Sequence, residues 1–197
     1  MALIQGIGGV DEAGRGPLAG PVVAAAVVLG PGQHIPGVRD SKRLSPRRRE
    51  ELAVVIRRES IAWGLGRAEV AEIDELNILQ ATLMAMRRAV EAMGYSPQSL
   101  RFDGNVAPQI PGFAGEMETL IGGDGRCSAI AAASILAKVT RDAEMIRLDR
   151  MYPEYGFARH KGYPTRDHRR VLGALGPCPV HRRSYRPVRL ALRLTED

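Results

Sequence analysis

Cysteine is scarce in this chain. The 197 residues include only Cys127 and Cys178, which are too few for a disulfide framework and too far apart for a zinc knuckle. None of the four histidines has the spacing of a zinc site either. We therefore expect both thiols to be reduced and structural.

Long apolar runs are missing as well. The apolar stretch Val22–Leu29 is far too short to cross a bilayer. The N-terminus shows no basic segment followed by an apolar one, as a signal peptide would. The chain also contains no internal repeat and no low-complexity tract. These absences predict a soluble, cytoplasmic protein without membrane contact.

Negative charge is in short supply in the last third of the chain. The whole chain has 28 Lys and Arg against 22 Asp and Glu, a net charge of +6. Residues 138–197 hold 14 of the basic and 7 of the acidic residues, so the earlier residues are close to neutral. This distribution is typical of a protein that lays one face on a polyanion such as nucleic acid. Charge alone leaves a second interpretation open, a solvated basic surface that keeps the protein soluble.

The pattern of apolar residues predicts the fold class. The length suits one domain over residues 1–197, with its basic part from about residue 140. The expected strands span residues 2–10, 21–29, 61–68, 100–102 and 117–121, and the expected helices span residues 46–59, 77–93 and a long stretch from about 128. Residues 22–29 hardly alternate, so both faces of that strand should be covered. Early strands followed by alternating helices and strands predict a mixed sheet flanked by helices, in the α/β or α+β class.

Four acidic residues follow four of these apolar runs: Asp11, Glu12, Asp103 and Asp124. Carboxylates at strand ends can converge on one edge of a sheet, and close carboxylates raise one another's pKa unless a cation lies between them. Mg²⁺ or Mn²⁺ would fill that role through oxygen ligands. A single Asp-Gly pair is more often an ordinary turn. Because four acids share the pattern, metal binding is the favoured interpretation, and turn capping remains the alternative.

A glycine-rich segment follows the first two acids. Gly14 and Gly16 carry no side chain, so a ligand backbone could approach their N–H groups closely. Arg15 between them supplies a positive charge suited to phosphate. No Gly-Lys-Ser/Thr follows, which excludes a nucleotide-binding P-loop. A plain hairpin turn is the alternative.

Six motifs together resemble the type 2 ribonuclease H family. Residues 11–22, Asp-Glu-Ala-Gly-Arg-Gly-Pro-Leu-Ala-Gly-Pro-Val, are similar to its N-terminal signature. The other five motifs are Asp40-Ser41-Lys42, Phe102–Asn105, Ser128–Asp142, Tyr155–Thr165 and His181–Val188, and all stand in family order. The chain departs from the family at Gly122, where a Lys is usual, and at Arg101, where an apolar residue is common. It also lacks the aromatic clamp-binding peptide of some relatives.

The resemblance implies an α/β ribonuclease H-like fold with a small, helical, basic C-terminal extension. It also implies an endonuclease that hydrolyses the RNA strand of RNA–DNA hybrids and cuts at single ribonucleotides in duplex DNA, leaving 3′-hydroxyl and 5′-phosphate ends. The family uses two divalent ions, Mg²⁺ or Mn²⁺. Carried over by motif, the metal ligands and catalytic residues would be Asp11, Glu12, Asp103 and Asp124. Asp142, a fifth acid near these motifs, is expected to be structural or to support the site from outside.

The resemblance also assigns substrate contacts. Gly14, Arg15 and Gly16 would sense the 2′-hydroxyl group, helped by Tyr163. The expected phosphate contacts are Lys42, Arg159 and Lys161, extended by Arg182, Arg183 and Arg186. His160 and His181 lie in basic segments and could also touch phosphates, whereas His168 is expected at the surface. The family expectation is a monomer without an obligate protein partner.

Two other classes remain as competitors at this stage. A type 1 ribonuclease H or integrase-like nuclease shares acids at strand ends, but the adjacent Asp11-Glu12 pair and the Gly-Arg-Gly segment disfavour it. A non-catalytic nucleic-acid-binding module is favoured by charge alone. Such a module would need no metal and would bind duplexes equally well after losing the acids.

Overall fold

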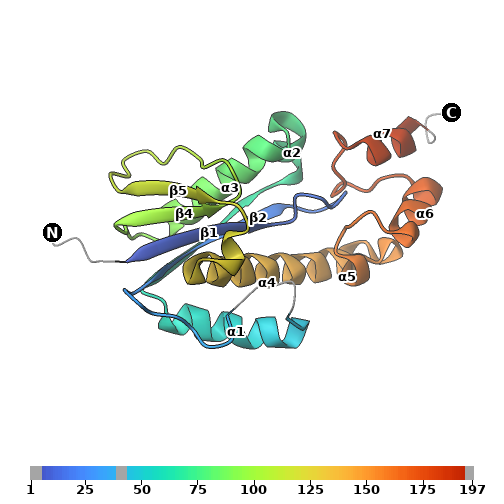
Figure 1. The fold of residues 1–197 in the computed structure, drawn as a ribbon. Helices are drawn as coiled ribbons and strands as arrows, with labels where there is room; N and C mark the ends of the chain where they lie inside the picture. The colour runs from blue at the N-terminus through green and yellow to red at the C-terminus, as the bar shows by residue number, and fades with distance from the viewer. Residues whose placement is uncertain (1–5, 39–43, 194–197) are drawn as a thin grey trace.

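The computed structural model describes residues 6–38 and 44–193 (Figure 1). In chain order the elements are β1 (Ile7–Ala13), β2 (Val22–Leu29), α1 (Pro46–Glu59), β3 (Ala62–Ala68), α2 (Val70–Leu76), α3 (Ile78–Ala92), β4 (Ser99–Asp103), β5 (Glu116–Leu120), η2 (Gly123–Gly125), α4 (Ser128–Met151), η3 (Pro153–Tyr155), α5 (Phe157–His160), α6 (Arg166–Leu175) and α7 (Arg186–Arg193). None of these helices is both long and apolar enough to cross a membrane.

The strands form one mixed sheet in the order β3-β2-β1-β4-β5. Strands β1, β2 and β3 pair antiparallel, while β4 and β5 run parallel to β1. The predicted α/β class is confirmed. One boundary was wrong: β1 continues through Ala13, so Asp11 and Glu12 lie within the strand and not after it. The expected strand over residues 2–10 falls partly outside the described residues.

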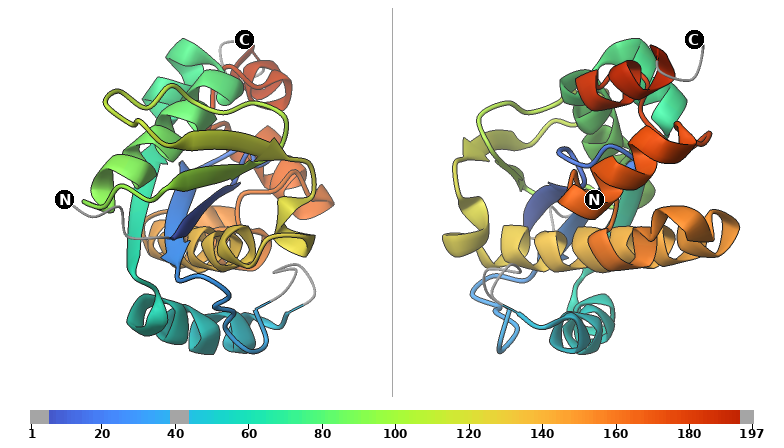
Figure 2. Two further views of the ribbon diagram at one scale, coloured as in Figure 1. Left: turned by 60° about the vertical axis from the view of Figure 1, so that its left-hand side comes forward. Right: turned by 90° about the vertical axis from the view of Figure 1, so that its right-hand side faces the viewer.

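Helices cover both faces of the sheet (Figure 2). Every residue of β2 is buried, as the sequence predicted. Val22, Ala24, Ala26 and Val28 pack in one core cluster with residues of α3. Ala25, Val27 and Leu29 point to the other face and pack with residues of α4 and α1. Figure 1 shows α4 along this face with α1 beyond it.

Small residues let the two large helices lie very close to the sheet. A Cβ atom added to Gly9 of β1 would lie 2.1 Å from the backbone nitrogen of Ile130 in α4. A Cβ on Gly66 of β3 would lie 2.0 Å from the carbonyl oxygen of Ala85 in α3. These distances are far below van der Waals contact, and the neighbouring atoms belong to helix backbone. The glycines therefore set the spacing between the sheet and both helices.

Two local features depart from the sequence expectations. Helix α2 was not predicted; its N-terminus is closed by a capping box between Glu69 and Glu72, although Glu is an uncommon N-cap residue. Arg101, unusual in the family motif, pairs across strands with Glu118 at 3.2 Å on the half-exposed part of β4 and β5. This ion pair accounts for a charged residue at that position.

We predict that Gly9→Ala destabilises the fold by about 3 kcal/mol, the upper end of the usual cost of overpacking, because the neighbouring atoms are helix backbone. Gly173→Ala in α6 is the matched control, since open space surrounds a Cβ at that glycine. Ala has the higher helix propensity, so this control should be neutral or stabilised by up to about 1 kcal/mol. Urea unfolding of both variants gives the comparison. Equal stability of the two would contradict the proposed spacing constraint.

Candidate active site

Three acids from two adjacent strands meet in one cleft. Asp11 and Glu12 lie on β1, and Asp103 is the last residue of β4. The strands are parallel, and their pairing ends at Val10 beside Phe102. The residues that follow in the two strands, Asp11 and Asp103, therefore lie side by side. The cleft has a volume of about 260 Å³. It is lined by Asp11, Glu12, Ala13, Gly14, Arg15, Gly16, Asp103, Ser134, Lys138 and Tyr163.

The acids disturb one another's ionisation. Burial raises the pKa of Asp11 well above its usual value, and the negative charges of Glu12 and Asp103 raise it further. Burial and the charge of Asp103 raise the pKa of Glu12 as well, against the opposing effect of Arg15. Arg15 offers only a loose ion pair, 3.4 Å from Glu12. Without further positive charge the three carboxylates are unfavourable neighbours.

Short hydrogen bonds orient two of these carboxylates. Oδ1 of Asp11 accepts a 2.7 Å hydrogen bond from the backbone N–H of Glu12, and the Ser134 hydroxyl group also bonds to Asp11. Oδ1 of Asp103 accepts a 2.7 Å hydrogen bond from the N–H of Gly123. Each carboxylate is thus held in place by hydrogen bonds while it lines the cleft.

Asp124 is held near this cleft but does not line it. It lies half-buried in η2, directly after the glycine that bonds to Asp103. The turn enters η2 through Gly122 at φ 64°, in the left-handed region. Glycine suits that conformation better than the lysine usual in the family motif, which gives a physical reason for this departure.

Helix α4 contributes two cleft residues that sequence reasoning did not single out. Ser134 and Lys138 are four residues apart and therefore share a helix face. Nζ of Lys138 lies 2.8 Å from Oδ1 of Asp142, one further turn along. Asp142 thus orients a cleft lysine, in line with the supporting role expected for it. The i, i+4 spacing of these three residues was the available signal.

The glycine loop and Tyr163 line the same cleft as the acids. Gly14 has φ 103°, and a Cβ there would lie 2.0 Å from Nε of the buried Arg141, so only glycine fits. The Tyr163 ring is 42% exposed, and its edge would lie 3.7 Å from a Cβ on Gly16. Both sequence-predicted recognition elements therefore lie beside the acids.

The predicted phosphate-binding residues are more scattered. Lys42 lies outside the described residues. Arg159 is exposed and lies 3.8 Å from Asp167. Nζ of Lys161 donates to the Ala158 carbonyl at 2.6 Å. Neither Arg159 nor Lys161 lines the acidic cleft; Lys161 lines a neighbouring groove between α1 and α4.

Four predictions about basic side chains were wrong. Arg182 is fully buried and cannot extend an exposed track, whereas Arg183 and Arg186 are exposed. His160, His168 and His181 are all buried, so none is a surface residue or a phosphate contact. These residues form a small polar core, which the basic, loop-like sequence did not predict.

These histidines form a hydrogen-bonded cluster under Tyr163. Nδ1 of His181 accepts from the Cys178 N–H at 3.1 Å, so its Nε2–H donates to Nε2 of His168 at 3.0 Å. Nδ1–H of His168 then donates to the Tyr163 carbonyl at 2.9 Å. His160 stacks on His168 with ring centroids 4.3 Å apart. The chain of bonds requires neutral rings and fixes the backbone at Tyr163.

We predict acid sensitivity from this cluster. Burial, and then the neighbouring His168, lowers the pKa of His181 to about 4. The unfolded chain takes up that proton near pH 6.5, so the stabilisation is complete above pH 6.5 and is lost as the pH falls toward 4. Between pH 7 and 5 the loss is about 2 kcal/mol.

Thermal unfolding of the wild type and His181→Asn at pH 7 and pH 5 measures this effect. The wild type should lose more stability than the variant over that range. His34→Asn is the matched control because His34 is exposed, and it should behave as the wild type does. An identical loss in all three proteins would argue against the cluster as the cause.

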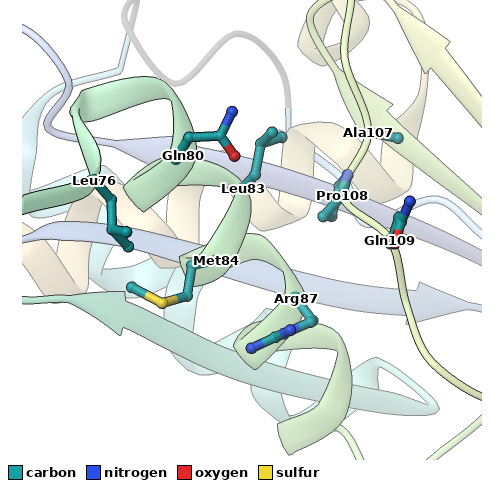
Figure 3. Close-up of a pocket in the computed structure, with 8 residues that line it drawn as sticks. All are labelled: Leu76, Gln80, Leu83, Met84, Arg87, Ala107, Pro108 and Gln109. Atoms are coloured by element: carbon teal, nitrogen blue, oxygen red, sulfur yellow. The ribbon is translucent and has the colours of Figure 1, made fainter. Parts of the chain in front are cut away.

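A second groove lies away from the acids. Its volume is about 450 Å³, and it is lined by Leu76, Gln80, Leu83, Met84, Arg87, Ala107, Pro108 and Gln109 (Figure 3). The helical residues face the loop that follows β4. No carboxylate lines it, so it offers neither metal ligands nor a general base.

Comparisons with known proteins agree with this geometry. A family model described as ribonuclease HII matches residues 8–188. The chain is 55% identical to ribonuclease HII of Nitrosococcus oceani over 94% of this chain and 90% of that protein. It is 57% identical to ribonuclease HII of Halorhodospira halophila over 95% of both. The crystal structure of ribonuclease H2 from Pyrococcus horikoshii superposes with a TM-score of 0.81 at 28% identity, covering 98% of this chain and all of that one.

Proposed function

Because this chain belongs to the ribonuclease HII family, we propose that the cleft around Asp11, Glu12 and Asp103 is its catalytic centre. The chain is a metal-dependent endonuclease that cleaves RNA in RNA–DNA hybrids and at ribonucleotides embedded in duplex DNA. The observation that carries the proposal is the convergence of three acids beside the Gly14–Gly16 loop. A non-catalytic nucleic-acid-binding module would not require carboxylates that repel one another in its binding cleft.

The donor set of the cleft fits hard divalent cations. Carboxylate oxygens are the preferred protein ligands of Mg²⁺ and Mn²⁺. Burial and neighbouring carboxylates raise the pKa of both Asp11 and Glu12, and a cation between the acids would relieve that conflict. In the described ranges no three His, Cys, Asp or Glu side chains enclose a metal position by themselves. Mg²⁺ commonly completes its coordination with water and substrate phosphate. We propose two ions held by Asp11, Glu12 and Asp103, with Asp124 as the fourth ligand.

The protein residues supply position and charge. When bound, the ions would activate a water molecule and stabilise the leaving 3′ oxygen. Ser134 and the Glu12 N–H hold the Asp11 carboxylate toward the cleft, and the Gly123 N–H does the same for Asp103. Lys138 lines the same cleft, where its positive charge would attract the scissile phosphate. A fixed arrangement of this kind lowers the entropic cost of reaching the transition state.

Recognition of the ribose would fall to the glycine loop and Tyr163. Gly14, Arg15 and Gly16 place backbone groups where a 2′-hydroxyl group can exchange hydrogen bonds. The exposed Tyr163 ring can stack on the next sugar, which a 2′-deoxy position permits. Both elements lie within one cleft with the acids, so sensing and cleavage would occur at adjacent nucleotides.

The basic region from about residue 140 to 197 would hold the duplex. Lys161 and Arg159 lie on the segment that leads into Tyr163, and with Lys42 they would contact phosphates without reading sequence. We propose that the chain acts as a monomer without an obligate partner, because a single chain brings the three acids, the glycine loop and Tyr163 together in one cleft.

We predict that Asp11→Asn or Asp103→Asn lowers cleavage by at least about a thousandfold, which corresponds to roughly 4 kcal/mol of transition-state stabilisation. An amide cannot supply the charge that a metal ligand needs. Asp11→Asn should also raise the melting temperature of the metal-free protein, since it removes one of three mutually repelling charges. Cleavage of a labelled duplex and thermal unfolding with and without Mn²⁺ provide both readouts.

Glu91→Gln is the control for these variants because Glu91 is exposed on α3 and does not line the cleft. It should retain activity, and Mn²⁺ should raise its melting temperature as in the wild type. Near-native cleavage by Asp11→Asn with Mg²⁺ would refute the assignment of this carboxylate.

We predict that Tyr163→Ala impairs cleavage at a single embedded ribonucleotide far more than cleavage of a long RNA–DNA hybrid. A single junction must be recognised in one register, whereas a hybrid offers a 2′-hydroxyl group in every register. Loss of a stacking contact of about 1–3 kcal/mol corresponds to a roughly 5- to 150-fold loss in kcat/KM. Measuring kcat and KM on both substrates at one salt concentration tests this. Equal losses on both would leave Tyr163 with a structural role only.

A further inference from the structure

The Gly14–Gly16 loop is held from behind by a buried arginine. All five N–H donors of Arg182 are used. Nη2 donates to the carbonyl oxygens of Gly14 and Gly20, Nη1 donates to the carbonyl of Arg15, and Nε donates again to Gly20. The remaining Nη1 donor reaches the Tyr185 hydroxyl at 3.0 Å. Every partner is a neutral oxygen, so this guanidinium group serves the loop and not an acid.

Tyr185 completes the same contact. Its hydroxyl donates to the Arg15 carbonyl at 2.6 Å while it accepts from Arg182. The carbonyl of Arg15 thus receives two hydrogen bonds from one side. The turn between Arg182 and Tyr185 is itself fixed, because Asp74 of α2 accepts from the N–H groups of Arg183 and Ser184, both at 2.9 Å.

The orientation of these carbonyls determines where the loop's N–H groups point. The described peptide bonds are trans, and in a trans peptide the C=O and the following N–H point in opposite directions. Tying the Gly14 and Arg15 carbonyls back to Arg182 therefore turns the N–H groups of Arg15 and Gly16 the other way, toward the cleft. Within the described part of the chain, neither N–H donates to a protein acceptor.

We infer that Arg182 and Tyr185 are positioning residues for ribose selectivity, which act through the Gly14–Gly16 backbone without touching the substrate. The inference rests on the proposed recognition of the 2′-hydroxyl group by that loop. The C-terminal segment would then contribute to specificity as well as positive charge, because the side chains of residues 182 and 185 determine which backbone N–H groups face the cleft.

Tyr185→Phe is the sharpest variant, because it deletes one hydroxyl and leaves the ring and the arginine in place. Tyr155→Phe is its matched control: Tyr155 also donates its hydroxyl to a backbone carbonyl, that of Gly176 at 2.8 Å, without contact to the loop. Both variants lose one hydrogen bond of similar kind, so a general loss of stability should be similar in the two.

The measurement is binding to two duplexes in the cleavage-deficient Asp103→Asn background, one all-DNA and one with a single ribonucleotide, at one salt and one Mn²⁺ concentration. The ratio of the two Kd values is the selectivity. Tyr185→Phe should reduce this ratio about three- to tenfold, the range expected for one hydrogen bond. Tyr155→Phe should leave it unchanged. In the cleavage-competent protein, Tyr185→Phe should lower kcat on the single-ribonucleotide duplex, as misplaced contacts do.

Arg182→Lys provides a second test that retains the positive charge. Lysine lacks the planar fork that reaches several carbonyls at once, so the selectivity ratio should fall by more than in Tyr185→Phe. An unchanged ratio in both Tyr185→Phe and Arg182→Lys would overturn the inference, as would an equal fall in Tyr185→Phe and Tyr155→Phe. If the parent protein shows no preference for the ribonucleotide duplex, the proposed recognition by the loop fails, and the inference fails with it.

Discussion

Repulsion among three carboxylates in one small cleft is the constraint around which this molecule is arranged. Asp11, Glu12 and Asp103 are brought together by the parallel pairing of β1 and β4, and a folded chain gains no stability from that arrangement alone. The cost is tolerated because the sheet is held rigidly on both faces, with glycines in β1 and β3 allowing helix backbone within contact distance. Repulsion between close carboxylates, with the pKa shifts that it causes, is typical of functional sites. It does not stabilise the fold.

The glycine loop shows the complementary arrangement of charge. Arg141 and Arg182 are buried, and in the described residues they donate to backbone carbonyls and, for Arg182, also to the Tyr185 hydroxyl. Burial lowers the pKa of Arg141 to about 10. Positive charge thus lies on the carbonyl side of the glycine loop, and the acids line the same cleft as the loop. A nucleic-acid strand bound in the cleft would place its phosphates near the positive charge of the arginines. The cations that accompany the strand would neutralise the carboxylates. The C-terminal third is therefore part of the cleft's construction, since it supplies Arg182 and the histidine cluster beneath Tyr163.

Much of this was predictable from the sequence, for identifiable reasons. Strand β2 and helices α1, α3 and α4 carry strong apolar patterns, and Asp11, Glu12 and Asp103 stand in a motif with fixed local structure. The wrong predictions about basic side chains share one cause. Arg182, His168 and His181 are polar residues in a basic segment, and they are held in the interior by partners more than ten residues away in the chain. Pattern reasoning assigns such residues to the surface because it cannot see those partners. Helix α2 was missed because its capping residue, Glu69, is an unusual one.

Calorimetric titration of the metal-free protein with Mn²⁺, in two buffers of different ionisation enthalpy, tests the central claim most directly. The pKa values of Asp11 and Glu12 are raised by burial and by their neighbours, so a cation that enters the cleft should expel protons. The account predicts net proton release on binding at pH 5.5, less release at pH 8, and no comparable binding to a double Asp11→Asn, Asp103→Asn variant. Binding without proton release at either pH, or equal affinity for the double variant, would contradict it.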